Sequence, residues 1–305
     1  MADKINNNMS NLIQRTLSGA VYVAVVVASI LIHPLAFVSV FAIVSTLAVR
    51  EFHYITGDPK YTTVFGMLLN VLLFASIGVW RLCDRLIATN YVFETSISQI
   101  LLFVYLVVLL LALVYELSQF EAAQPAAHWG HLFAGQVMVA LPFATMLVML
   151  DYSKWLLLAL FVLLWTNDTG AYCVGSLTAK RANGNHKMSP HVSPKKSWEG
   201  LFGGAVFVLL AAWLLTACGW FDCVDSWQYE PCLYAKYWVA MGFGVLAVVA
   251  GTLGDLMESL LKRSYGIKDS GRFLPGHGGV LDRFDSLLLA TPVMAIYLTL
   301  IRMFI

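Results

Sequence analysis

The sequence predicts an all-α, polytopic integral membrane protein with about nine transmembrane helices. Two observations lead to this fold class. Of the 305 residues, 59% are hydrophobic and only 12% are charged, a composition that does not suit a water-soluble surface. Several apolar runs reach the roughly 20 residues that a helix needs to cross the hydrocarbon core. The net charge of +1 is uninformative by itself, and no basic stripe with interleaved aromatic residues indicates nucleic-acid binding.

Nine apolar runs define the expected spans. The first follows a polar segment and lacks a small-residue cleavage site, so we interpret it as an uncleaved helix and not as a signal peptide. The fifth contains Pro142, which a membrane helix tolerates when neighbouring groups satisfy the freed carbonyl. The runs cover residues 17–32, 35–49, 61–79, 97–115, 131–150, 155–177, 201–217, 235–258 and 286–305.

The chain is expected to form a single membrane domain over residues 1–305. The five spans of residues 1–150 carry few ionisable groups, and we expect them to form a scaffold that also shapes a lipid-accessible groove. Residues 151–305 are expected to hold the catalytic spans and cytoplasmic loops. There Asn167 and Asp168 interrupt the sixth run, and an ionisable side chain at such a position normally faces a polar cavity. Local capping or hydrogen bonding between helices is the alternative for these two residues.

The most informative segment is Gly251–Asp285, which we name the charged stretch. It gathers many carboxylates, lysines and arginines between two strongly apolar runs. Oxygen ligands for a hard cation beside fixed positive groups suit a magnesium-phosphate site. Its glycines Gly276, Gly278 and Gly279 allow sharp turns and a close approach to a ligand. The alternative is a charged loop between membrane helices that follows the positive-inside bias.

A basic connection precedes the seventh run. Lys195 and Lys196 lie just before the expected start of that helix, where ammonium groups and helix N-terminal N–H groups both favour anions. This pair therefore suits a triphosphate. Ordinary positive-inside bias is the alternative, and it is our interpretation of Lys180, Arg181 and Lys187.

The order of residues in the charged stretch matches one enzyme family. It resembles, without a gap, the signature of the phosphatidate cytidylyltransferases, also called CDP-diacylglycerol synthases. The segments 167–172 and 193–200 and the distribution of apolar runs extend the resemblance. The matching signature positions are Ser259, Lys262, Arg263, Lys268, Asp269, Gly271, Pro275, His277, Gly278, Gly279, Asp282, Arg283 and Asp285.

The resemblance implies an integral membrane enzyme that joins CTP to phosphatidate, releases pyrophosphate and uses Mg²⁺. The attacking phosphate is already an anion, so the enzyme has to bring two polyanions together and stabilise the leaving group. We expect catalytic contributions from Asp255, Asp282, Lys268, Asp285 and His277. We expect substrate contacts from Ser193, Lys195, Lys196, Lys262, Arg263, Arg283 and Asp168. Asp255 and Asp282 are the chief expected magnesium ligands, with Glu258 and Asp285 as further candidates. The roles of Asp168, between metal support and nucleotide contact, and of His277 stay open.

Three rival functions remain to be separated. A CTP-dependent lipid kinase would release CDP instead of pyrophosphate and would need a base for a lipid hydroxyl. A transporter would place its charges at mid-membrane across several helices, whereas these charges gather in connections and at helix ends. A CDP-alcohol phosphotransferase would carry an Asp-Gly-x2-Ala-Arg pattern, which we do not find.

The distribution of basic residues predicts the orientation. With nine spans and the N-terminus inside, most lysines and arginines fall on one side, so we expect an active site that faces the cytoplasm of a bacterial inner membrane. Cys218, Cys223 and Cys232 share a short connection on the other side, where they form either a disulfide or free thiols. The sequence leaves the number of metals, the acyl-chain preference and the formation of a homo-oligomer open.

Overall fold

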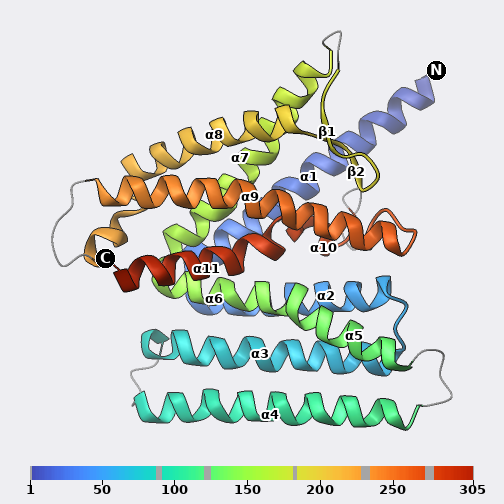
Figure 1. Cartoon of the computed structure of the whole chain (residues 1–305), viewed down its shortest axis with the longest axis vertical. Helices are drawn as coiled ribbons and strands as arrows, with labels where there is room; N and C mark the ends of the chain where they lie inside the picture. The colour runs from blue at the N-terminus through green and yellow to red at the C-terminus, as the bar shows by residue number, and fades with distance from the viewer. Residues whose placement is uncertain are drawn as a thin grey trace. The chain divides into compact units, whose positions relative to one another are not determined.

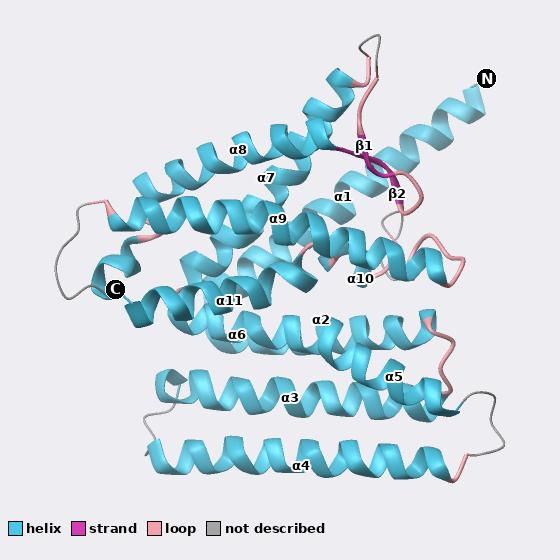
Figure 2. Cartoon of the chain, viewed as in Figure 1, coloured by secondary structure: helices cyan, strands magenta, loops and turns pink. Residues whose placement is uncertain are grey.

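The computed structural model describes residues 2–86, 91–119, 125–180, 184–227, 234–271 and 278–304. This part of the chain is almost entirely helical, as Figure 2 shows, which confirms the predicted all-α fold. It divides into two compact units. The first unit is Met1–Leu147 with Ser264–Phe284, and the second is Val148–Arg263 with Asp285–Ile305. The assignment of scaffold and catalytic roles to residues 1–150 and 151–305 stays a prediction.

The first unit is built from long helices. His33 begins α2, because its Nδ1 accepts a hydrogen bond from the Leu35 N–H at 3.2 Å and Pro34 follows at the first helical position. Helices α3 and α4 run side by side (Figure 1). The unit contains α1 (Ala2–Ile32), α2 (Pro34–Ile55), α3 (Lys60–Leu86), α4 (Tyr91–Leu117), α5 (Pro125–Gly135), the π-helical turn η1 (Gln136–Ala140), the first part of α6 (Leu141–Tyr152) and α10 (Leu281–Phe284).

A π-helical turn accommodates Pro142 in the fifth predicted span. Pro142 has no N–H, so the normal helical bond at that position is missing. The wider turn η1 directly precedes it, and there the Leu141 N–H donates to the Gln136 carbonyl. The helix therefore continues from α5 through η1 into α6 without a break.

An aromatic cluster forms the core of the first unit. Phe37 and Phe41 of α2 stack with ring centroids 4.2 Å apart. Phe284 of α10 lies 5.9 Å from Phe41, 5.2 Å from Phe143 and 5.5 Å from Tyr22, measured between ring centroids. Edge-to-face contacts at these distances are favourable. They hold the end of the charged stretch against α1, α2 and α6.

The second unit contains the two strands that the structure describes. The strands form an antiparallel hairpin within a connection that we had predicted to be loop alone, and Figure 2 shows it in magenta. Its register pairs Lys187 with Ser197 and Ser189 with Ser193. The unit contains the end of α6, α7 (Lys154–Thr178), β1 (Lys187–Ser189), β2 (Ser193–Ser197), α8 (Trp198–Ala217), the 3₁₀ turn η2 (Asp222–Trp227), α9 (Ala235–Ser264) up to Arg263, and α11 (Leu287–Phe304).

Helices α7 and α8 pack closely in the second unit. A Cβ atom at Gly204 would lie 2.6 Å from Asn167 Oδ1 and 2.9 Å from the Asn167 carbonyl oxygen. A Cβ atom at Gly170 would lie 2.9 Å from Cδ2 of Phe207. Glycine at these positions therefore lets the two backbones approach, as small residues commonly do between membrane helices.

The helices make this chain a multi-pass membrane protein. In the described part of the chain, eight helical stretches are long and apolar enough to cross a bilayer, and Thr16–Ile32 is a shorter apolar stretch, so a count of nine is not confirmed. In the described part of α4, only Ala112 and Glu116 are buried. The eight stretches are Pro34–Ile55, Lys60–Arg81, Ile97–Leu117, Ala126–Tyr152, Lys154–Thr178, Trp198–Ala217, Ala235–Ser264 and Leu281–Phe304.

Candidate functional site

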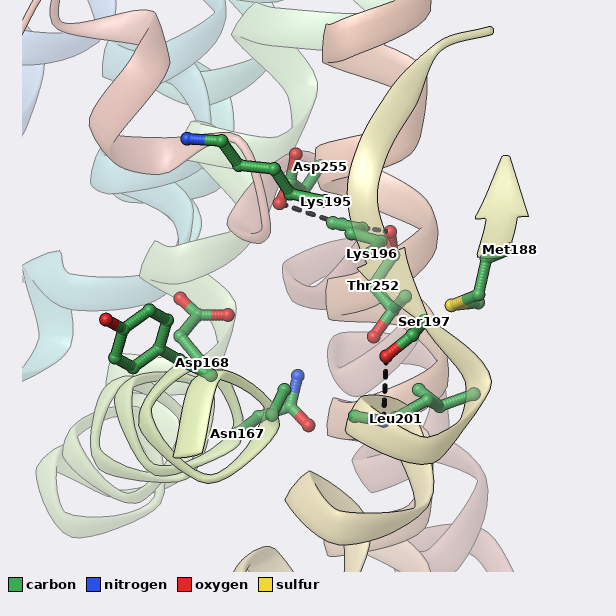
Figure 3. Close-up of a pocket in the computed structure, with 12 residues that line it drawn as sticks. Asn167, Asp168, Met188, Lys195, Lys196, Ser197, Leu201, Thr252 and Asp255 are labelled. Carbon is green, nitrogen blue, oxygen red and sulfur yellow. Dashed lines mark hydrogen bonds and ion pairs between the residues drawn. The ribbon is translucent and has the colours of Figure 1, made fainter. Parts of the chain in front are cut away.

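A polar cavity of about 270 Å³ lies in the second unit. It is formed by α7, the hairpin, α8 and α9. In Figure 3, Asn167 and Asp168 project from α7 toward the cavity, opposite Lys196 and Asp255. The cavity is lined by Asn167, Asp168, Ala171, Tyr172, Met188, Lys195, Lys196, Ser197, Gly200, Leu201, Thr252 and Asp255. Four of the predicted site residues thus line one space.

Lys196 connects the hairpin to α9. Its Nζ lies 2.7 Å from Asp255 Oδ2 and donates a hydrogen bond of 3.1 Å to the Thr252 carbonyl oxygen. The side chains of Lys196 and Asp255 keep 21% and 27% of their surface exposed, so a ligand can still reach both. The ion pair fixes a positive and a negative group side by side at the cavity wall.

Ser197 sets the direction of the hairpin relative to α8. It ends β2 and caps α8, because its Oγ accepts a hydrogen bond of 3.2 Å from the Gly200 N–H. Asn185 donates to the Gly175 carbonyl oxygen at 2.7 Å, which ties the segment before β1 to the end of α7. Lys196 therefore directly precedes the N-cap Ser197 of α8, and Lys195 lies two residues before it, close to the helix N-terminus as predicted from the sequence.

Acidic groups of the second unit gather around Lys196. The Asp285 carboxyl, at the start of the second segment of this unit, interacts electrostatically with Asp255, Asp168 and Lys196. Its Oδ1 also accepts a hydrogen bond of 2.6 Å from the Ser286 N–H. Carboxylates within electrostatic range of one another repel, so this region favours the addition of positive charge.

Glu258 has a different partner from the one expected. We had grouped it with Asp255 because residues three apart share a helix face. Glu258 is buried, and its Oε2 lies 2.6 Å from Nζ of Lys262, one turn further along α9. Among the described residues, no three His, Cys, Asp or Glu side chains form a group placed to hold a metal ion. The metal assignment of Asp255, Asp282, Glu258 and Asp285 stays a prediction.

Asp282 lies in the first unit and organises the chain around it. Its Oδ2 accepts hydrogen bonds from the N–H of Ser270 at 2.9 Å and of Gly279 at 2.8 Å. The Asp282 N–H in turn donates to Ser270 Oγ at 3.3 Å. These bonds join the two described sides of the charged stretch in this unit, so at least one Asp282 oxygen has a structural role.

Glu51 is a residue that we did not single out from the sequence. It lies in the last turns of α2, and its carboxylate accepts three hydrogen bonds from residues more than 200 positions away. The donors are Ser270 Oγ at 3.0 Å, the Val280 N–H at 2.9 Å and the Leu281 N–H at 2.8 Å. No local pattern signals such a contact, because the partners are distant in sequence.

The remaining predicted site residues do not line the cavity or lie outside the described residues. Ser193 begins β2 and does not line the cavity. Arg263, at the end of the α9 segment in the second unit, and Lys268, in the first unit, are exposed. Arg283 lies in α10, where its carbonyl oxygen accepts a hydrogen bond of 3.2 Å from the Tyr22 hydroxyl. His277 and Cys232 lie outside the described residues, so their expected roles are untested.

Asn167 adds a polar group at the cavity. Its Oδ1 is buried and has no hydrogen-bond partner within the described residues. This oxygen faces Gly204 of α8, where a Cβ atom would lie 2.6 Å from it, so it is part of the contact between the two helices. The sequence pointed to this position, since Asn167 and Asp168 interrupt an apolar run.

A second carboxylate network in the first unit surrounds Asp58. The Asp58 oxygens contact Nδ1 of His53 and Nδ1 of His131, each at 2.6 Å, and accept a bond of 2.7 Å from Thr56 Oγ1. Burial alone raises the pKa of Asp58, but these hydrogen bonds outweigh it, so its pKa lies below the ordinary value. His131 Nε2 is 2.9 Å from the Tyr265 hydroxyl, and burial together with the Asp58 charge raises the pKa of Tyr265.

Comparison with known proteins identifies relatives of this chain. The model of the Cytidylyltransferase family matches residues 13–301. Over 138 residues the chain is 40% identical to a protein of Staphylococcus epidermidis and 39% identical to one of Staphylococcus aureus. It is 37% identical over 166 residues to a protein of Rickettsia felis. All three relatives are named phosphatidate cytidylyltransferase.

These matches cover only part of each protein. The two staphylococcal matches span 45% of this chain and 46% of the relative. The Rickettsia match spans 54% of this chain and 68% of the relative. The chain thus spans about half the length of the staphylococcal relatives that it matches.

Proposed function

Because the chain belongs to the cytidylyltransferase family, we propose that it transfers CMP from CTP to phosphatidate, giving CDP-diacylglycerol and pyrophosphate. The observation that carries this proposal is the cavity where Lys195 and Lys196 face Asp168 and Asp255. Ammonium groups bind phosphate oxygens, and carboxylates bind a divalent cation. Both are needed to bring two polyanions together.

The proposed reaction balances without a general base. A phosphate oxygen of phosphatidate attacks the α-phosphorus of CTP, and a new P–O bond forms. The bond between the α-phosphorus and the bridging oxygen to the β-phosphorus breaks, and pyrophosphate leaves with that electron pair. Since the attacking oxygen is already an anion, no proton has to be removed. Lys195 and Lys196 are assigned to the polyphosphate, where they offset charge on the leaving group.

The donor set fits Mg²⁺ at this cavity. Magnesium in phosphate-processing sites is commonly held by one or two carboxylates together with substrate phosphates and water, so a complete cage of protein ligands is not required. We assign Asp255 to this cation, with support from Asp285 and Asp168, whose negative charges interact. When bound there, Mg²⁺ would neutralise phosphate charge and polarise the α-phosphoryl group.

The size of the cavity suits part of the nucleotide. Its volume of about 270 Å³ is close to the lower end of the ~300–1,000 Å³ typical of small-molecule sites. We therefore assign the cavity to the polyphosphate of CTP. The Asn167 side chain, which lines the cavity, is assigned to a nucleotide contact.

Labelled CTP tests the proposal. Purified protein in detergent, with phosphatidate and Mg²⁺, should transfer label from α-phosphate-labelled CTP to the lipid fraction and release pyrophosphate. Label in the γ-phosphate should appear only in pyrophosphate. In a parallel assay with diacylglycerol in place of phosphatidate, transfer of γ-label to the lipid with release of CDP would instead identify a lipid kinase. Chelation should abolish transfer, and Mg²⁺ should restore it.

We also propose that the cavity opens to the cytoplasm of a bacterial inner membrane. The relatives are bacterial, and the basic residues of the hairpin follow the positive-inside bias. CTP is made in the cytoplasm, so this side supplies the substrate. In a variant whose native cysteines are replaced by serine, a single cysteine introduced at Lys187 should resist an impermeant thiol reagent in intact cells and react after lysis. Reaction in intact cells would place the hairpin on the outer side.

A further inference from the structure

We propose that Glu51 is the positioning residue that shapes the charged stretch around Asp282. This proposal rests on the proposed function, because it concerns a segment assigned to that reaction. All of its contacts lie in the first unit.

Glu51 binds both described sides of the charged stretch. Its Oε2 accepts hydrogen bonds from Ser270 Oγ at 3.0 Å and from the Leu281 N–H at 2.8 Å. Its Oε1 accepts from the Val280 N–H at 2.9 Å. The Leu281 N–H is the first of α10 and has no partner within that helix. One carboxylate thus satisfies donors that would otherwise be buried and unpaired.

The location of Glu51 is unfavourable without these donors. It lies in the last turns of α2, where the partial negative charge of the helix C-terminus repels a carboxylate. It is also only partly exposed, so water does not fully solvate it. Hydrogen bonds to an ionised acceptor are the strong ones, and three of them compensate both effects.

Two signature glycines make room for Glu51. A Cβ atom at Gly271 would lie 2.6 Å from Glu51 Oε1. A Cβ atom at Gly279 would overlap Glu51 Oε2 and Ser270 Oγ. We had expected Gly276, Gly278 and Gly279 to allow close approach of a ligand. At Gly271 and Gly279 the close approach is made by a side chain of the protein itself.

The contacts form a relay that ends at Asp282. Ser270 donates its hydroxyl to Glu51 and its N–H to Asp282 Oδ2. Gly279, which closes against Glu51, donates its N–H to the same Asp282 oxygen. Glu51 does not contact Asp282 in these bonds. It fixes the backbone that fixes Asp282, which is how a positioning residue acts.

The first test compares Glu51→Gln with a matched control, Glu116→Gln. Glu116 is a carboxylate of the first unit that is buried, and it accepts bonds from Thr62 at 2.8 Å and Tyr61 at 3.1 Å, away from the charged stretch. Glutamine keeps the size of glutamate but presents an NH₂ group to N–H donors. Amide hydrogen exchange of Val280 and Leu281, measured without substrate, should rise about tenfold or more in Glu51→Gln. The same amides should be unchanged in Glu116→Gln.

The second readout separates positioning from general destabilisation. After correction for the folded fraction, kcat for CDP-diacylglycerol formation should fall about tenfold or more in Glu51→Gln, while the KM for CTP stays within about threefold. Glu116→Gln should lose activity only in proportion to its folded fraction. Adding Ser270→Ala to Glu51→Gln should increase the kcat loss less than Ser270→Ala does alone, because the two residues act through one bond.

If Glu51→Gln does not fold, Gly279→Ala gives the same comparison, because its Cβ overlaps the Glu51 carboxylate. Unchanged exchange at Val280 and Leu281, or a kcat equal to that of Glu116→Gln, would overturn the role of Glu51. A wild-type protein that transfers no nucleotide would instead overturn the proposed function. The exchange measurement needs no substrate, so the two failures are distinguishable.

Discussion

The carboxylates of the two units have different partners. In the first unit, Glu51 and Asp282 accept hydrogen bonds from backbone N–H groups, which compensate their charge within the protein. In the second unit, Asp285 interacts with the charges of Asp255 and Asp168, and Lys196 is the cation paired with Asp255. Hydrogen bonds from N–H groups stabilise the ionised form of a carboxylate within the protein, whereas neighbouring carboxylates favour the addition of a cation. The number of acidic residues in the charged stretch therefore does not indicate how many of them bind a ligand.

The largest effect is expected at Asp255. Asp255→Asn keeps the size of the side chain but removes the charge proposed to hold Mg²⁺, so turnover should fall by about a hundredfold or more. Steady-state rates at saturating Mg²⁺ measure this. Asp222→Asn is the matched control, because Asp222 is an exposed carboxylate of the second unit whose Oδ1 lies 2.8 Å from Nζ of Lys236. Near-normal turnover of Asp255→Asn would remove Asp255 from the metal site.

Asp282→Asn tests whether a carboxylate that accepts backbone N–H bonds differs in function from one that lies near other carboxylates. The asparagine oxygen can still accept the N–H bonds of Ser270 and Gly279, although more weakly than a charged acceptor does. We expect turnover to fall about tenfold, with little change in the Mg²⁺ concentration that gives half-maximal rate. A loss as large as that of Asp255→Asn, with a raised Mg²⁺ requirement, would instead support the metal role predicted from the sequence.

The lysines of the hairpin are expected to differ from one another. Lys196 lines the cavity and pairs with Asp255, whereas Lys187, in β1, is exposed and does not line it. Lys196→Ala should raise the KM for CTP about tenfold, and Lys187→Ala should change it less than about twofold. Lys195→Ala should resemble Lys196→Ala. Equal effects at all three positions would favour positive-inside bias as the reason for these residues.

The smallest effect is expected at Asp58 of the first unit, and it concerns the stability of the folded protein. The pKa of Asp58 is lowered in the folded protein, so its contribution is fully present above the unfolded value of about 3.9 and is lost as the pH falls through the folded value. Asp58→Asn should lower the free energy of unfolding at pH 7 by about 1–3 kcal/mol. The difference from wild type should shrink below pH ~4. Thermal denaturation in detergent across this pH range measures it, and a constant difference would contradict the assignment.

Hydropathy was sufficient to predict an all-α membrane fold, because a membrane span needs a long apolar run and little else. Asp168, Lys195 and Lys196 could also be predicted from the sequence as site residues. A charge within or beside an apolar span is costly, so it normally faces a polar cavity. The hairpin could not be predicted, because β1 has three residues and neither strand alternates clearly between apolar and polar side chains.

The partners of individual carboxylates were the least predictable part. Glu258 was grouped with Asp255 by helix periodicity, but its charge is compensated by Lys262 at the equally plausible spacing of four. Glu51 stood among spans that we expected to be scaffold, and its partners lie more than 200 residues away. Helix periodicity predicts which residues share a face of a helix. It does not predict which hydrogen-bond donor or cation contacts each carboxylate on that face.

The exposure of α4 has a consequence for how this protein varies between species. Among its described side chains, only Ala112 and Glu116 are buried, and most of the exposed ones are apolar. Some positions are packed within the protein: Tyr105, Val108 and Leu109 contact the buried cluster of Leu69, Ala112 and Leu132, and Ser98 hydrogen-bonds to Ser76. At the exposed positions lipid tails do not select for side-chain shape, so Leu, Ile, Val and Phe are nearly interchangeable. We expect a saturation mutagenesis map to show these exposed positions of α4 accepting almost any apolar residue. Substitutions should therefore accumulate there faster than in α7, whose packed face fixes the size of each side chain.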